Sequence, residues 1–333
     1  MKRVLIIGPD FHYFNESIER AFRQLGWETK VEAFATPMHP YTLWNKIRYK
    51  LSSDKLALKQ ESRQRYDAHI RACFDSYQPD LVFILNGDNL TTSTVAYCHK
   101  QSKVVFWLFD SITRMRHTLD NLREADAVYC YEQKDIPLLA KEHIKASFLP
   151  QAVDSTLYYP MPEIEKKYDI VFAGEIWNSE KRQHLLQVVI NHFPDKKIRI
   201  VGRYKIPTKG FFSWLFRKHR DIYTNKNASA EELNLLYNQA RVVLNIHNEQ
   251  QKDGANPKVY EILASGTHEI CDANPFIERE FGNCPYVLLY TNASDLVHKI
   301  HQALDKPQPR HDVDMSKHTF LYRIESVLSN LQL

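Results

Sequence analysis

Asp253 and Glu261, two acidic residues with seven residues between them, flank the start of a predicted helix. The apolar run 241–246, "RVVLNI", is typical of a buried strand, and residues 256–266 have helical periodicity and end at a glycine. Pro257 is favoured in the first turn of a helix. The N-terminus of such a helix offers free N–H groups and the positive end of its dipole, and both suit a diphosphate.

The side chains around this helix start complement one another chemically. Asn256 and Pro257 form the helix tip, and Lys258 adds a positive charge for the same phosphates. Glu261 follows about one turn deeper, where a carboxylate can accept hydrogen bonds from the two hydroxyls of a ribose. Asp253 precedes the helix and can reach the hydroxyls of a sugar attached to the diphosphate. The stretch therefore predicts a binding loop for a nucleotide diphosphate that carries a sugar.

Each of these residues also has a purely structural interpretation. Glu261 can be an exposed helix carboxylate, Lys258 a solvated helix residue, and Asp253 a loop residue before a turn at Gly254. His247, directly after the strand, can be a ligand-binding residue or a hydrogen-bonded structural histidine. The sequence leaves these alternatives open.

Further cations follow other predicted strands. The strand 168–174 ends at Gly174, and Lys181 and Arg182 lie at the start of the helix 179–192. Cations at a helix N-terminus oppose the dipole, and a bound diphosphate would relieve that cost. Surface charges with no ligand are the alternative. In the same way, Arg203 and Lys205 follow the strand 197–202 and are candidate phosphate contacts.

The elements that must position these residues form two successive α/β patterns. Strands and helical segments alternate in each half, which predicts parallel, doubly wound sheets. A linker with three prolines, 149–167, separates the halves. We expect a first Rossmann-like domain at 1–155, a second at 156–314, and a final helix at 315–333 that is able to pack back on the first. The predicted strands are 4–7, 27–34, 80–85, 103–110, 126–131, 146–150, 168–174, 197–202, 240–246, 267–272 and 286–290.

The segment 241–272 resembles the donor-binding signature of GT-B glycosyltransferases, in which an acidic residue and a glutamate precede an "ASG" turn. It resembles most closely the CgeB-like (spore maturation protein type) branch, which shows "LNIH" and then a "KVYEILASG"-like string, here 244–247 and 258–266. Further matching segments follow in the order expected for that branch. They are "WLFD" (107–110), "LPQAVD" (149–154), "YDIVFAGEIWNSEKR" (168–182) and "HTFLYRIESVL" (318–328).

The resemblance implies a GT-B fold whose two parallel sheets face an interdomain cleft. It also implies transfer of a sugar from a nucleotide-sugar donor, favouring a UDP-sugar, to a glycan such as a lipid-linked or cell-surface saccharide. The chain departs from retaining family 4 enzymes at Asp253, where they usually carry glutamate, and at the reduced loop "GPDFHY" (8–13). A sugar-nucleotide 2-epimerase and a non-catalytic nucleotide-sugar-binding protein remain alternatives with the same architecture.

An inverting transferase would need a general base, and a retaining one, which we favour, would not. Asp110, Asp88 and His12 follow first-half strands and are candidates, although both aspartates can instead cap turns. The string "DVDM" (312–315) precedes the final helix, so we interpret it as capping and expect no metal. Lysine, arginine and the helix dipole would then neutralise the leaving group, with no cofactor beyond the co-substrate.

Composition excludes several other classes. Hydrophobic residues make up 44% and charged residues 25%, with a formal net charge of +4, so nucleic-acid binding is not expected. Five cysteines without C-x-x-C spacing favour a reducing compartment, and no apolar run reaches the ~20 residues of a membrane span. We expect a cytoplasmic protein, peripheral on the inner membrane face. Two basic segments suit anionic lipid, one from Lys46 to Arg71 and one from Phe211 to Arg220, and a solvated face is the alternative.

Overall fold

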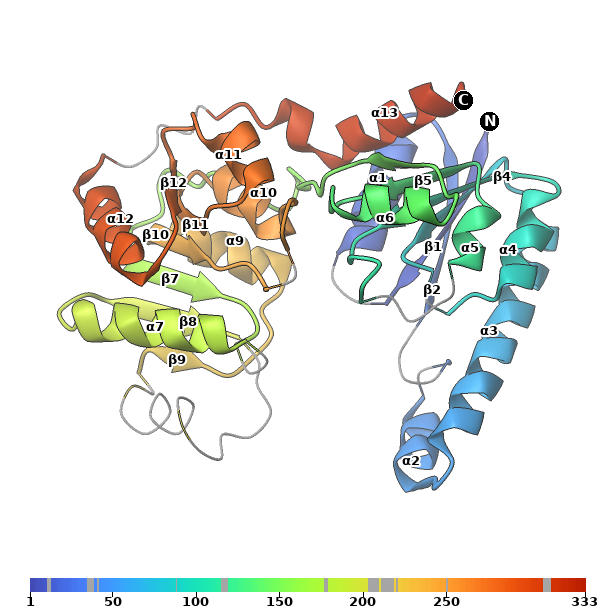
Figure 1. Ribbon diagram of the computed structural model, residues 1–333, viewed down its shortest axis with the longest axis horizontal. Coiled ribbons are helices and arrows are strands. Elements are labelled where there is room, and N and C mark those ends of the chain that lie inside the picture. The colour runs from blue at the N-terminus through green and yellow to red at the C-terminus, as the bar shows by residue number, and fades with distance from the viewer. Residues whose placement is uncertain are drawn as a thin grey trace. The chain divides into compact units, whose positions relative to one another are not determined.

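The computed structural model forms two compact units, one comprising Met1–Pro150 with Phe320–Leu333 and the other Gln151–Thr319 (Figure 1). It describes residues 1–10, 13–34, 39–40, 42–87, 89–114, 119–176, 179–202, 210, 219, 221–249, 251–307 and 313–333. Four predicted site residues, His12, Asp88, Arg203 and Lys205, lie outside these ranges, as does 211–220 except for His219.

The first unit contains a six-stranded parallel sheet in the order β2-β1-β3-β4-β5-β6. The central strands consist of buried apolar runs, as expected for a parallel sheet covered by helices on both faces. The strands are β1 (Arg3–Pro9), β2 (Glu28–Phe34), β3 (Leu81–Leu85), β4 (Lys103–Leu108), β5 (Ala127–Cys130) and β6 (Ala146–Phe148). The helices are α1 (Phe14–Gln24), α2 (Leu43–Leu51), α3 (Lys55–Tyr77), α4 (Thr92–His99), α5 (Asp120–Arg123), α6 (Asp135–Lys141) and α13 (Phe320–Leu331).

The second unit contains a parallel sheet in the order β12-β11-β10-β7-β8-β9. Counted within the unit, this is the 3-2-1-4-5-6 order of a Rossmann fold, whose direction of winding reverses between β7 and β10. The strands are β7 (Tyr168–Ala173), β8 (Ile198–Val201), β9 (Tyr223–Thr224), β10 (Ala240–Asn245), β11 (His268–Asp272) and β12 (Val287–Tyr290). The helices are α7 (Glu180–His192), α9 (Ala230–Asn238), α10 (Pro257–Ala264), α11 (Pro275–Phe281), α12 (Ala293–Asp305) and the 3-10 turn η1 (Ser316–His318).

The predicted α/β architecture of two Rossmann-like domains with parallel sheets is confirmed. The structure adds short elements that the sequence analysis did not assign, namely β9, α5, α6, α9 and α11. It also divides the predicted helical region 42–77 into α2 and α3. None of the helices formed by the described residues is long and apolar enough to cross a membrane.

The chain enters and leaves the second unit at one place. Val153 pairs with Thr319, and the Val153 N–H donates to the His318 carbonyl at 2.9 Å. The division therefore falls after Pro150, whereas the sequence analysis placed it after residue 155. The helix that follows belongs to the first unit, where the Phe320 ring packs edge-on against Trp107 at 6.0 Å between centroids.

Two glycines bring the ends of β7 and β8 into close contact. The Gly174 N–H donates to the Val201 carbonyl at 2.9 Å, and the Gly202 carbonyl accepts from the Tyr223 hydroxyl at 2.6 Å. A Cβ at Gly202 would lie 2.0 Å from the Gly174 carbonyl oxygen. Backbone atoms cannot move aside as a flexible side chain does. A side chain at position 202 would therefore displace the backbone of the loop that follows β7.

We predict that Gly202→Ala lowers the unfolding free energy of the second unit by roughly 1–3 kcal/mol, because the added methyl group forces the Gly174 backbone to shift. Urea denaturation followed by tyrosine and tryptophan fluorescence measures the change. Lys196→Ala, an exposed change just before β8, is the control and should stay within about 0.5 kcal/mol of the parent. A Gly202→Ala protein as stable as the control would contradict the close approach.

Candidate functional site

The predicted binding loop lies at the point where the second sheet reverses its winding. β7 and β10 are hydrogen-bonded neighbours there, and Gly174 and His247 follow their carboxyl ends. Open α/β sheets bind ligands at the carboxyl ends of such strands. The topology therefore brings residues that are distant in the sequence to one edge of the sheet. They are 174–176 and 179–182 on one side, and 245–249 and 251–261 on the other.

The helix α10 begins at this edge without a side-chain cap. Its N-cap residue is Asn256, whose amide does not bond to the helix's own N–H groups. Instead it forms a reciprocal pair with Asn245: Asn256 Nδ2 donates to Asn245 Oδ1 at 2.8 Å, and Asn245 Nδ2 donates to Asn256 Oδ1 at 3.1 Å. Both side chains are buried. Pro257 has no N–H, and the Val259 N–H lies 3.4 Å from the Asn256 carbonyl, so the first turn offers an anion the positive end of α10 and the Lys258 N–H.

The other helices described in the second unit begin differently. A serine or asparagine side chain accepts a first-turn N–H bond in α7, α9, α11 and α12, with Ser179, Ser229, Asn274 and Asn292 as the caps. Among the described helices of that unit, α10 is thus the exception. The exception has a physical cause, since the asparagine that normally caps is held by a residue of β10.

Lys258 lies in this uncapped turn and is half-buried. Its Cε would be 3.7 Å from a Cβ placed on Gly174, so its stem passes over the end of β7. Burial lowers the pKa of Lys258, and the charge of Arg182 acts in the same direction, while Glu261 and Glu175 oppose the shift. A bound anion would stabilise the charged ammonium, which the desolvated site otherwise disfavours. Its half-buried position distinguishes Lys258 from a fully solvated helix lysine.

Glu261 is buried, with 4% of its surface exposed, so it is not an exposed helix carboxylate. A second buried carboxyl that the sequence analysis did not identify, Glu269 on β11, accepts a hydrogen bond from Asn245 Nδ2 at 2.8 Å. Burial raises the pKa of Glu269 well above its usual range. Because Asn245 also holds Asn256, the Glu269 carboxyl supports the start of α10 through two amides.

His247 is bonded through both ring nitrogens. Nδ1 lies 2.8 Å from Asp272 Oδ1, and Nε2 lies 3.3 Å from the backbone nitrogen of Asn256. A backbone N–H can only donate, so Nε2 accepts and Nδ1 carries the proton that it donates to Asp272. Of the two interpretations that the sequence left open, these contacts favour the structural histidine. It joins the ends of β10 and β11 to the start of α10.

Asp272 also binds Lys181, whose Nζ lies 2.5 Å from Oδ2. Burial acts to raise the pKa of Asp272, but the hydrogen bond from His247 and the charge and hydrogen bond of Lys181 outweigh it, and the pKa lies well below its usual range. No sequence motif pointed to Asp272. Its position at the end of β11, next to β10, was the only available signal.

Arg182 is buried and joins the loops after β7 and β10. Its Nε donates to the Ile246 carbonyl at 2.8 Å and its Nη1 to the Glu175 carbonyl at 2.7 Å. Burial lowers the pKa of Arg182, although neighbouring carboxylates, Asp272 first, act against the shift. Arg182 and Lys181 have more N–H donors than these bonds use, so their phosphate contacts stay predictions.

The two predicted acidic candidates each have a cationic neighbour. Asp253 Oδ1 lies 3.1 Å from Arg279 Nη2 of α11, at the same edge as α10. Asp110 lies after β4 in the first unit, where its Oδ1 is 2.9 Å from Arg114 Nη1. Each residue is placed at the carboxyl edge of its own sheet, and its role in the reaction stays a prediction.

His247, Cys271 and Asp272 lie close enough together to be considered as metal ligands, with ligand atoms within 4.8 Å of one another. Two of these atoms, His247 Nδ1 and Asp272 Oδ1, already share a proton. Burial, together with the neighbouring Glu269, raises the pKa of the Cys271 thiol well above its usual range, whereas a metal binds the thiolate. The chemistry of the three groups suits an internal hydrogen-bond network better than a metal site.

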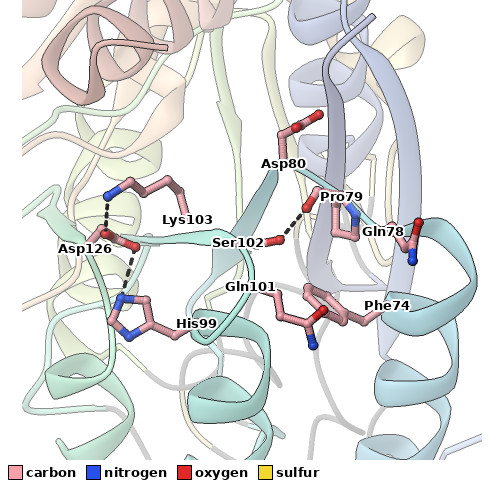
Figure 2. A pocket seen from close by; sticks show the side chains of 9 residues that line it. All are labelled: Phe74, Gln78, Pro79, Asp80, His99, Gln101, Ser102, Lys103 and Asp126. Carbon is pink, nitrogen blue, oxygen red and sulfur yellow. Dashed lines mark hydrogen bonds and ion pairs between the residues drawn. The ribbon is translucent and has the colours of Figure 1, made fainter.

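A surface hollow of about 490 Å³ belongs to the first unit and lies at the amino edge of its sheet (Figure 2). Figure 2 shows Asp126 between Lys103 and His99, with Nζ 2.8 Å and Nε2 3.3 Å from its oxygens. Asp126 also accepts the Val104 N–H at 2.8 Å, and Asp80 accepts the Arg3 N–H at 2.7 Å. These aspartates cap neighbouring strands, which accounts for the polar lining without a ligand.

One comparison with known proteins concerns the part of the chain that contains α10. Residues 181–326 match the model of a family described as "Glycosyl transferase-like". The match includes all of α10, and α7 from its second residue onward. This part of the chain is therefore similar in sequence to glycosyl transferase-like proteins. No curated protein is significantly similar to the chain in sequence.

Solved structures share the fold over nearly the whole chain. Sucrose-phosphate synthase from Thermosynechococcus elongatus aligns with a TM-score of 0.64 and 13% identity, covering 99% of this chain and 95% of that one. A UDP-forming trehalose-phosphate synthase from Burkholderia xenovorans, in complex with glucose-6-phosphate, aligns with a TM-score of 0.65 and 11% identity, covering 99% and 100%. The chain has the GT-B fold. UDP-GlcNAc 2-epimerase from Methanocaldococcus jannaschii is also similar to this GT-B chain, with a TM-score of 0.58, 12% identity and coverage of 99% and 100%.

We predict that Asp272→Asn destabilises this GT-B chain by about 2–4 kcal/mol at pH 7, because it leaves Lys181 and the His247 Nδ1–H without a carboxylate. The folded-state pKa of Asp272 is lowered, so its contribution is fully present above the unfolded value of about 4 and is lost as the pH falls through the folded value. Thermal unfolding at pH 7, 4 and 3 should show the difference from the parent shrinking below about pH 4. A difference that grows on acidification would contradict the assignment.

The exposed Asp305→Asn is the matched control. It removes one carboxylate of the same unit and should stay within about 0.5 kcal/mol of the parent at pH 7.

Proposed function

We propose that the chain is a glycosyltransferase that moves a sugar from a nucleotide-sugar donor to a hydroxyl group of a glycan. The observation that carries the proposal is the uncapped first turn of α10 with Lys258 in it, at the switch point of a Rossmann sheet. It fits a diphosphate, and the glycosyl transferase-like family match covers the same residues.

In the proposed complex, the positive end of α10 and the N–H and ammonium of Lys258 hold the diphosphate and stabilise the charge that develops on it as the sugar leaves. Glu261 accepts hydrogen bonds from the ribose, and Asp253 orients the donor sugar. Gly174 leaves room for the phosphates above the end of β7. Arg182, Lys181 and His247 hold the surrounding loops in place before the donor arrives, which limits reorganisation during the reaction.

Several finer features belong to the same proposal. We favour UDP as the nucleotide, a retaining reaction without a metal, and a lipid-linked or cell-surface saccharide as acceptor. UDP agrees with the UDP-forming synthase among the structural neighbours. The CgeB-like assignment is supported by the strings "LNIH" and "KVYEILASG". Asp110 is the acceptor-side candidate that the structure describes.

A sugar-nucleotide 2-epimerase is the second candidate, since one solved 2-epimerase has a similar fold. A transferase and an epimerase would both bind the nucleotide-sugar at α10. They differ in whether an acceptor is consumed and in whether the nucleotide is released, so a product assay separates them.

We predict that Lys258→Gln weakens UDP binding by roughly 10- to 100-fold, because it removes the charge closest to the diphosphate. Glu261→Gln should weaken UDP to a similar extent but leave inorganic pyrophosphate unchanged, because the carboxylate contacts the ribose. Isothermal titration calorimetry with UDP and with pyrophosphate measures both effects. If Glu261→Gln weakened both ligands equally, Glu261 would act through the charge of Lys258 and not on the ribose.

Lys252→Gln is the matched control for the lysine, since Lys252 is an exposed residue of the same loop. It should leave UDP affinity within about twofold of the parent. Equal losses in both lysine variants would indicate a general effect of charge and would contradict a specific site at α10.

We predict that the parent chain, incubated with UDP-sugars and a mixed glycan acceptor, releases UDP in an acceptor-dependent manner and that Lys258→Gln abolishes the release. Anion-exchange chromatography of the nucleotides measures the products. An isomerised UDP-sugar without UDP release would instead establish the epimerase. Donor binding with neither product would overturn both enzymatic functions in favour of a binding protein.

A further inference from the structure

We propose that α2 is a docking element that lies in the interface of an anionic lipid bilayer. The proposal goes beyond the transferase function and rests on another part of the molecule. In Figure 1, α2 lies at the tip of the long helix α3, away from the sheet of the first unit.

The apolar side chains of α2 face solvent. Leu43 is 74% exposed, Trp44 72% and Leu51 81%, with Ile47 at 40%. The polar Asn45 of the same helix is buried. An amphipathic helix of a globular protein normally has the opposite arrangement, with its apolar stripe on the core. Contiguous exposed apolar residues on a short helix indicate an interaction surface for a protein or a membrane.

The spacing of these residues defines an interfacial helix. Successive residues of a helix are rotated by about 100°. One sector of about 100° of the α2 circumference therefore contains Leu43, Ile47, Leu51 and Trp44. Lys46 and Lys50 border this sector on one side and Arg48 on the other. Cations that flank an apolar stripe with a tryptophan are typical of a helix that lies flat in a headgroup region.

Specific contacts hold the polar side of α2 inward. Arg48 forms a two-bonded ion pair with Glu61 of α3, at 3.2 and 2.9 Å. Asn45 Nδ2 donates to the Pro40 carbonyl at 2.8 Å, and the Thr42 side chain caps the helix. The apolar stripe is therefore presented outward by a fixed arrangement.

The charge of this arm complements an anionic surface. Residues 42–65 contain seven lysines and arginines against Asp54 and Glu61, a net charge of +5. The whole chain carries +4, so the remaining residues carry −1 in total. Each cation near an anionic leaflet contributes about 1 kcal/mol to binding. The basic charge of the chain is thus concentrated beside the exposed stripe.

The same charge disfavours a second copy of this chain as the occupant, because two arms of +5 would repel each other. The small area of α2 also disfavours a second copy as the occupant. A nine-residue helix is about 14 Å long and about 10 Å wide, whereas a stable protein interface covers about 800 Å² per partner. The stripe is small for a protein partner and adequate for insertion of a few side chains into lipid.

The sequence analysis proposed lipid contact for residues 46–71 from their charge alone. The structure adds the exposed apolar stripe and shifts the centre of the contact to Leu43–Leu51. The second basic segment, around Phe211 and Arg220, lies outside the described residues.

The test is sedimentation of the full chain with vesicles of phosphatidylcholine containing 30 mol% phosphatidylglycerol, compared with pure phosphatidylcholine. We expect binding to the anionic vesicles at low salt, reduced at least tenfold in 0.5 M NaCl. Trp44→Ser with Leu51→Ser should reduce the partition coefficient at least tenfold. Lys50→Gln with Lys55→Gln, both exposed cations, should reduce it by about fivefold for each charge removed.

Leu138→Ser with Leu235→Ser is the matched control, since both leucines are 39% exposed and lie on α6 and α9. It should sediment as the parent does. The proposal is overturned if the parent does not sediment with anionic vesicles at low salt, or if the α2 and control variants bind alike. It is also overturned if the parent is a dimer in solution that Trp44→Ser with Leu51→Ser dissociates. UDP affinity of the α2 variant should equal that of the parent, so this result is independent of the proposed transferase activity.

Discussion

The pairing of Asn256 with Asn245 is the interaction on which the candidate site depends. An asparagine at a helix N-cap normally bonds to the first-turn N–H groups of its own helix. Here its amide is held by a buried strand residue, so no side chain caps the first turn and the positive end of the helix dipole is left for an anion. The helix α10 thus loses some local stability, on the order of 1 kcal/mol. A ligand with negative charge would restore it.

The residues around this pair are held by one another before any ligand binds. Glu269 supports Asn245, while His247 joins Asp272 to the backbone of Asn256. Arg182 joins the loops after β7 and β10 through two carbonyls. Most of these side chains are buried and costly to desolvate, and each has at least one partner at hydrogen-bond distance. Such a network favours a site with one defined geometry, as positioning of a diphosphate and a reacting sugar requires.

Polar groups gather at the amino edge of the first sheet and at the carboxyl edge of the second, and the reasons differ. At the amino edge of the first sheet, Asp80 and Asp126 accept strand N–H groups and complete the sheet, so the hollow beside them is explained by capping. At the carboxyl edge of the second sheet, Asn256 leaves its helix uncapped. The two edges therefore differ in whether a polar side chain accepts the terminal backbone N–H groups. This difference describes them better than the size of a cavity does.

The sequence by itself determined the α/β class, most strands and the helix at 257–264, because these depend on local periodicity, proline and glycine. It also predicted Lys258 and Glu261 as ligand contacts, because their spacing along one helix is a local property. Only the tertiary structure decided that Asp272, Asn245 and Glu269 belong to the site, since the order of strands in the sheet brings them together. The outward face of α2 was likewise a tertiary result. A pattern of apolar and basic residues predicts an amphipathic helix, but the contacts of Asn45 and Arg48 decide which side faces solvent.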